Sequence, residues 1–128
     1  MKFTKEKTLT IVTYAIAAMF LMSGGMKFMA PPEMVENFAR WGFAQWFIYV
    51  VGAVEVGAAV LLALPATRVV GALILAVTMV GAAATHLLAG EYLHTFPAVM
   101  LLTGLTAVLY ANRTQVVFKL QTITARFL

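Results

Sequence analysis

The chain has 128 residues, of which 62% are hydrophobic and 11% are charged, and its mean hydropathy is +0.93. These values lie far outside the range of soluble globular proteins and predict an integral membrane protein. The absence of cysteine excludes disulfides, thiol redox relays, iron–sulfur clusters and thiolate metal sites. The net charge of +4 comes with no nucleic-acid-binding motif, so we interpret it as attraction to anionic lipid and expect no nucleic acid as a partner.

Charged residues divide the sequence into four apolar stretches, and each supplies the roughly 20 residues that a transmembrane helix needs. We expect transmembrane helices at about residues 8–29, 45–64, 68–89 and 96–111. Because these spans and their connections use nearly all of the sequence, residues 1–128 are predicted to form a single transmembrane domain. The predicted fold class is an all-α membrane protein, an antiparallel four-transmembrane-helix bundle.

The connection after the first span contains a short helix of its own. The pair Pro31-Pro32 stops the first span, and a proline is well placed at the start of a new helix. Residues 32–42 are amphipathic, with Met34, Phe38 and Trp41 on one side. We therefore expect a short amphipathic helix in the outer membrane interface, followed by an aromatic belt where the second span begins.

A tight turn joins the second and third spans at Pro65-Ala66-Thr67-Arg68, which makes them antiparallel neighbours. Small residues spaced four apart would let the two backbones approach closely. These pairs are Ala53 with Gly57, Ala59 with Ala63, and Ala72 with Ala76. The fourth span is expected to begin at Phe96 or Pro97.

The C-terminal segment, residues 113–128, has a helical period of its own. Val116, Leu120, Ile123 and Phe127 fall on one face and polar residues on another, which is typical of an interfacial helix. The alternative is a docking surface for a partner subunit, and the oligomeric state stays open.

Lys and Arg residues are distributed unequally between the two predicted sides of the membrane. Two are expected outside, Lys27 and Arg40, and seven on the side of the termini: Lys2, Lys5, Lys7, Arg68, Arg113, Lys119 and Arg126. Cytoplasmic segments carry such an excess, so we expect a multi-pass protein of the cell (inner) membrane with both termini in the cytoplasm.

Three ionisable residues lie within the predicted spans, namely Lys27, Glu55 and His86. Glu55 is the only charged residue between Arg40 and Arg68, and a carboxylate at the centre of a bilayer costs about 2.5–3.5 kcal/mol or more. Such residues are functional candidates. We therefore predict a polar pocket in the outer half of the bundle with Lys27, Glu55 and His86 as ligand-binding residues. Four further residues are predicted to line it: Phe20, Tyr49, Met79 and Ala82.

Each of these residues also has a purely structural interpretation. Lys27 could extend its ammonium to the outer headgroups. Glu55 could be protonated and hydrogen-bonded to a backbone carbonyl, Tyr49 or Thr85, and His86 could be a neutral imidazole that links two helices. The sequence leaves these alternatives open, and no catalytic residue can be assigned.

A metal site is not expected. His86, Glu91, His94 and Glu55 are suitable ligand types, but their spacing does not match a compact helical pair such as HxxxH or ExxH. His94 and Glu91 are expected at the outer surface, where solvation alone explains them.

Several short motifs fall in a characteristic order along the chain. They are Ser23-Gly24-Gly25-Met26-Lys27-Phe28, Trp41-Gly42, Trp46, Gly52-Ala53-Val54-Glu55 and Thr85-His86-Leu87. Over about residues 20–113 the chain resembles the DoxX-like family of small four-helix membrane proteins. The resemblance implies a four-helix bundle. The relatives that give the family its name are subunits of a thiosulfate:quinone oxidoreductase, while most members have no established activity.

Two functions follow as hypotheses. In the first, the pocket binds a quinone or another lipophilic small molecule, without a covalent cofactor, as part of a membrane redox system; the chain would then be a subunit of a quinone-linked oxidoreductase rather than an enzyme on its own. In the second, the protein is a non-enzymatic module that assists the assembly or stability of a partner protein in the bilayer.

Overall fold

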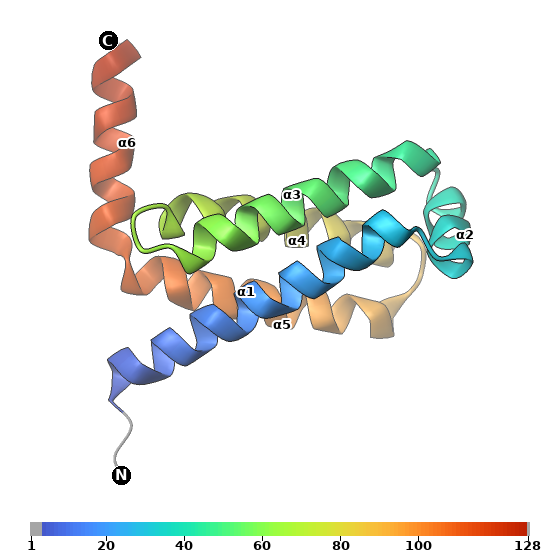
Figure 1. Ribbon diagram of the computed structural model, residues 1–128, viewed down its shortest axis with the longest axis horizontal. Coiled ribbons are helices and arrows are strands. Elements are labelled where there is room, and N and C mark those ends of the chain that lie inside the picture. The colour runs from blue at the N-terminus through green and yellow to red at the C-terminus, as the bar shows by residue number, and fades with distance from the viewer. Residues whose placement is uncertain (1–3, 128) are drawn as a thin grey trace.

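The computed structural model describes residues 4–127, and this part of the chain forms six helices (Figure 1). They are α1 (Lys5–Met29), α2 (Pro32–Arg40), α3 (Gln45–Ala63), α4 (Arg68–Leu88), α5 (Tyr92–Ala111) and α6 (Arg113–Phe127). Four of them, α1, α3, α4 and α5, are long and apolar enough to cross a membrane. The predicted all-α membrane bundle is therefore confirmed.

The four long helices form a ring in which α1 packs on α3, α3 on α4, α4 on α5 and α5 on α1. Helix α2 lies at one end of the bundle, and the α3–α4 turn lies at the other (Figure 1). Helix α6 starts at that second end, passes the α3–α4 turn and then projects beyond the bundle, crosswise to the long helices (Figure 1). We call these the α2 end and the α6 end.

The helix ends follow local sequence signals. Thr4 precedes α1, and its side chain accepts a hydrogen bond from the Lys7 amide at 3.2 Å. Ala30 ends α1 in the left-handed region, at φ 43°, immediately before the first proline of the pair. Gly42 and Gly90 take positive φ just after α2 and α4, where glycine carries no steric penalty.

Arg68 ties α4 to the end of α3. Its guanidinium donates to the backbone oxygens of Leu62 at 3.0 Å and Ala63 at 3.1 Å, and Thr67 donates to that of Leu61 at 2.8 Å. A cation at the C-terminus of a helix satisfies open carbonyls and complements the helix dipole. Arg68, the last residue of the predicted turn, therefore caps the C-terminus of α3.

Glycines set the closest helix crossings. A Cβ built on Gly71 would lie 2.5 Å from the carbonyl oxygen of Ala58, so only glycine lets α4 approach α3 this closely. Gly24 of α1 and Gly52 of α3 meet in the same way. The small-residue pairs expected from spacing include Gly57, which has no neighbour that an added Cβ would meet. Spacing alone did not identify which side of each helix faces its neighbour.

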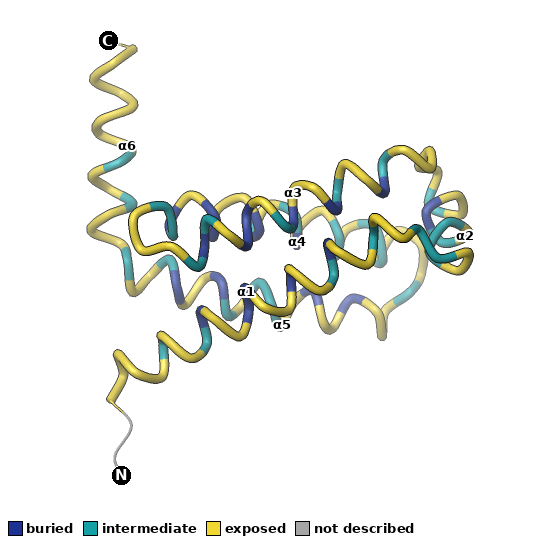
Figure 2. The backbone as a smooth tube through the Cα atoms, viewed as in Figure 1, coloured by how far each residue is buried: buried dark blue, intermediate teal, exposed yellow. Residues whose placement is uncertain are grey.

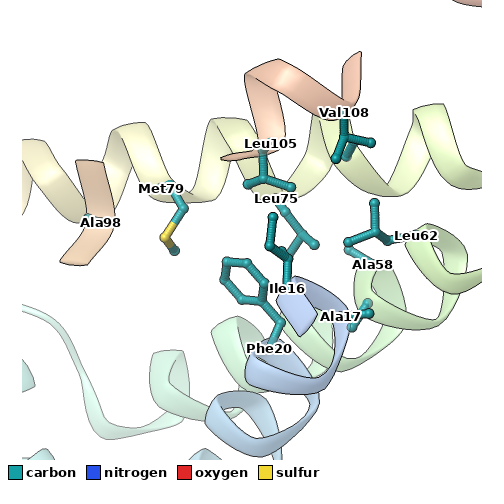
Figure 3. Close-up of a cluster of buried hydrophobic side chains, with 12 residues drawn as sticks. Ile16, Ala17, Phe20, Ala58, Leu62, Leu75, Met79, Ala98, Leu105 and Val108 are labelled. Atoms are coloured by element: carbon teal, nitrogen blue, oxygen red, sulfur yellow. The ribbon is translucent and has the colours of Figure 1, made fainter. Parts of the chain in front are cut away.

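The hydrophobic core occupies the half of the bundle nearer the α6 end. Phe20, Leu62, Leu75 and Leu105 are almost fully buried there and come from four different helices (Figure 3). Outward-facing positions are exposed along all four long helices (Figure 2), and many carry large apolar side chains such as Val77. Lipid tails contact these apolar side chains in the bilayer, so the bundle does not need to bury them in a large core.

Two helix starts differ from the sequence prediction. α1 begins at Lys5 rather than at about residue 8, because the N-cap at Thr4 adds nearly one polar turn ahead of the apolar run. α5 begins at Tyr92 rather than at Phe96 or Pro97, so that Pro97 lies inside the helix. At this position proline removes the hydrogen bond to the carbonyl oxygen of Leu93 and its ring crowds that oxygen, and both effects fall within the first two turns of α5.

Candidate functional site

A cavity of about 840 Å³ lies in the half of the bundle nearer the α2 end. All four long helices contribute to its wall, and α2 with the following loop closes its end. The volume falls within the range of pockets that hold small organic molecules. Most of the lining is apolar, with side chains such as Met34, Phe38, Val51, Met79 and Leu101.

One side of the cavity wall carries a buried ion pair between α1 and α3. The Lys27 ammonium lies 3.1 Å from Oε1 and 3.2 Å from Oε2 of Glu55. It also donates to the Ser23 hydroxyl oxygen at 2.8 Å. The Lys27 and Glu55 side chains are only 12% and 4% exposed, so the charge of Glu55 is balanced by a direct partner rather than by water.

The ion pair is positioned by the crossing of α1 and α3. Gly24 lies one turn before Lys27, and Gly52 one turn before Glu55. A Cβ on Gly24 would lie 2.8 Å from the Gly52 carbonyl oxygen, and one on Gly52 would lie 2.9 Å from the Lys27 Cβ. The two glycines therefore bring the backbones close enough for the side chains to meet.

A second polar cluster lies nearer the α2 end and is centred on Glu91, the residue before α5. Its Oε1 accepts hydrogen bonds from Trp41 Nε1 and from His86 Nδ1, each at 3.0 Å, and its Oε2 lies 2.6 Å from the Arg40 guanidinium. We call Arg40, Trp41, His86 and Glu91 the Glu91 cluster. It joins α2 to both ends of the α4–α5 turn.

The environment of Glu91 favours its ionised form. The hydrogen bond from His86 lowers the pKa of the Glu91 carboxyl below its usual value, and Trp41 and Arg40 act in the same direction against the opposing effect of desolvation. Aromatic contacts surround the same imidazole. The Trp41 ring meets His86 edge to face at 5.1 Å, and the His94 ring stacks on it at 5.9 Å.

The sequence-predicted site residues are distributed unequally around this cavity. Lys27, Glu55, His86, Met79 and Ala82 all line it. Lys27 meets Glu55 directly, whereas the polar contact of His86 is with Glu91.

Two expected lining residues do not line the cavity. Phe20 is 2% exposed and belongs to the hydrophobic core, because it lies two turns from Lys27 toward the α6 end. Tyr49 is 37% exposed and lies outside the lining, because it falls on a different side of α3 from Glu55.

Glu91 was expected at a solvated surface, and this interpretation is corrected. Its side chain is 15% exposed and holds three partners. A signal existed in the sequence, since Glu91 is one of only five acidic residues and follows His86 by five positions across Gly90. No comparable signal in the sequence predicts that Trp41, 50 positions away, donates a hydrogen bond to Glu91.

Within residues 4–127 no group of three or more metal-ligating side chains is gathered in one place. Two lining threonines, Thr78 and Thr85, donate their hydroxyl hydrogens to carbonyl oxygens of their own helix at 2.8 Å. Their oxygens remain as acceptors on the cavity wall.

A large part of the chain matches a model of a known protein family. The family model described as the DoxX-like family matches residues 11–109, which include every residue of the cavity wall. No curated protein and no solved structure matches the chain.

Proposed function

The chain belongs to the DoxX-like family, and we propose that the cavity at its α2 end binds a lipophilic small molecule with a polar head, namely a quinone. The observation that carries the proposal is the combination of an apolar cavity with two separate polar groups on its wall. The proposal assigns binding to this chain, as a component of a membrane redox system, and no reaction of its own.

The size and lining of the cavity support a ligand of this class. A volume of about 840 Å³ accommodates a substituted ring with part of an isoprenoid tail. Methionine and aliphatic side chains such as Met34, Met79 and Leu101 offer adaptable apolar contacts. The cavity is partly open rather than enclosed, which gives a lipophilic molecule a way in.

The polar groups support recognition of a head with oxygen atoms. The Lys27–Glu55 pair presents polar atoms with no net charge, and His86 presents an imidazole elsewhere on the wall. A neutral head that carries carbonyl or hydroxyl oxygens fits these groups without bringing an uncompensated charge into the bundle.

The test is the quinone content of the protein after extraction from membranes under mild conditions. We expect quinone to copurify with the wild-type chain. Ala82→Leu adds bulk to the cavity wall and should lower the bound quinone at least fivefold. Ala84→Leu adds the same atoms on the exposed side of the same helix and should leave it unchanged.

Equal quinone content in Ala82→Leu and Ala84→Leu, or none in the wild type, would contradict the proposal. A protein that copurifies in stoichiometric amount while the cavity holds no lipophilic molecule would favour the alternative, a module for assembly or stabilisation of a partner.

A further inference from the structure

Resting on the proposed function, we infer that the cavity recognises the hydroxyl-bearing form of its ligand, a hydroquinone-type head, through a hydrogen bond donated to Nε2 of His86. Glu91 is the positioning residue that keeps this nitrogen available. An open hydrogen-bond acceptor on the cavity wall would select which chemical form of the ligand is bound.

The contact between His86 and Glu91 fixes the hydrogen on one side of the imidazole ring. An ionised carboxylate only accepts hydrogen bonds, so the ring nitrogen 3.0 Å from Glu91 Oε1 must be the one that carries hydrogen. That nitrogen is Nδ1. Trp41 and Arg40 also donate to Glu91, and this arrangement holds the carboxylate in its ionised form.

In a neutral ring with hydrogen on Nδ1, Nε2 is a free acceptor. Among residues 4–127 no side chain or backbone group is hydrogen-bonded to His86 Nε2. In the same part of the chain every buried side-chain nitrogen or oxygen atom has a partner, so Nε2 must be accessible, and His86 lines the cavity. Because His86 lines the cavity, we infer that this open acceptor faces the cavity.

Three other polar residues on the cavity wall, Lys27, Thr78 and Thr85, have no hydrogen left to donate to a ligand. The three hydrogens of the Lys27 ammonium are matched by the Ser23 hydroxyl and the two oxygens of Glu55. Thr78 and Thr85 donate to their own helix and keep only acceptor capacity. At Lys27, Thr78, Thr85 and His86 the wall therefore suits a ligand that donates hydrogen bonds better than one that only accepts them.

The affinity test uses three probes that share one ring: tetramethylhydroquinone, tetramethylbenzoquinone and the dimethyl ether of the hydroquinone. Titrations are made without oxygen on the full chain in lipid nanodiscs. We expect the hydroquinone to bind about tenfold more tightly than either probe that lacks the hydroxyl hydrogen. In His86→Ala this preference should fall to within about twofold.

Two measurements test the positioning role of Glu91: the tautomer of His86, and the rescue of binding by Glu91→Gln. The chain has two histidines, so the ¹⁵N signals lost in His86→Gln identify His86. In the wild type Nδ1 should carry hydrogen, and the bare Nε2 signal should move on addition of the hydroquinone alone. Glu91→Ala should abolish the fixed tautomer and the binding preference, whereas Glu91→Gln, which still accepts from Nδ1, should retain most of both.

Arg40→Gln separates this role from the attachment of α2. It removes the contact to Oε2 of Glu91 and leaves Oε1 with His86, so the preference should persist. Equal loss in Arg40→Gln and Glu91→Ala would overturn the positioning role. Equal binding of all three probes by the wild type, or hydrogen on Nε2, would overturn the inference while the proposed function stands. Binding of none of them would overturn both.

Discussion

In the half of the bundle nearer the α6 end, Leu62, Leu75 and Leu105 are fully buried and fill the space between the helices, whereas nearer the α2 end the same four helices enclose a cavity of about 840 Å³. The packed half contains no charged side chain in its core. The buried ion pair and the Glu91 cluster both belong to the hollow half.

The two halves of the bundle therefore have different roles, one in stability and the other in ligand binding. Close packing at the α6 end holds the four helices together. Nearer the α2 end α1 and α3 stay close at Gly24 and Gly52, and the four helices enclose a cavity with costly polar groups on its wall. Met79 lies at the boundary, because it belongs to the hydrophobic core and also lines the cavity (Figure 3). Substitutions should therefore have different consequences in the two halves.

The largest effect is expected from breaking the ion pair. Lys27→Met leaves the Glu55 carboxylate buried without a partner, which should lower the free energy of unfolding by about 3–5 kcal/mol. The double variant Lys27→Met/Glu55→Leu should recover most of that loss and still fail to bind ligand. Unfolding by sodium dodecyl sulfate in mixed micelles measures this. If the double variant is no more stable than the single one, the pair is not the source of the effect.

The packed half should respond strongly to truncation of a core side chain. Leu75→Ala removes a fully buried side chain and should destabilise the protein by about 2–5 kcal/mol. Leu101→Ala, on the cavity wall, should lose less than half as much, because the space beside it is already open. Similar losses in the same unfolding assay would show that the cavity wall is packed as tightly as the core.

The α1–α3 crossing should be sensitive to a single methyl group. Gly24→Ala would place a Cβ 2.7 Å from Val56 Cγ2 and 2.8 Å from the Gly52 carbonyl oxygen, so we expect a loss of about 1–3 kcal/mol and a weakened Lys27–Glu55 contact. Gly25→Ala is the matched control, since its Cβ would meet nothing within 4 Å. Equal stability of the two variants would contradict the close crossing.

The smallest effect concerns acid pH at the α2 end. The pKa of Glu91 is lower in the folded protein than its usual value, so its contribution to stability is complete above that usual value and is lost as the pH falls through the lowered pKa. Acidification should therefore release Trp41 from Glu91. Fluorescence of Trp41 in a Trp46→Phe background should change only at acid pH, and Glu91→Gln should show no such transition.

Much of the architecture was predictable from the sequence, because each span is a long apolar run bounded by charge or proline. The turn at Pro65–Arg68 and the short helix after Pro32 also follow from local signals. The start of α5 did not, since a proline is compatible both with a helix start and with a place in its first turns.

The site was less predictable, because its geometry depends on which side of each helix faces inward. The rarity of charge identified Lys27, Glu55 and His86, all of which line the cavity. The positions of Phe20 and Tyr49 depend on how the helices cross and rotate, and a uniformly apolar helix carries no pattern that reveals this. The partner of His86 depends on a turn that returns Glu91 to the end of its own helix.

The most direct test of the hollow half as a ligand site is photolabelling of the protein in native membranes with a quinone that carries an aryl azide, followed by mapping of the labelled peptides. We predict label on cavity-lining residues of α3 and α4, such as Val51, Met79 and Ala82, and its loss when unmodified quinone competes. Label confined to lipid-facing residues such as Val77 and Leu73, unaffected by the competitor, would contradict the account.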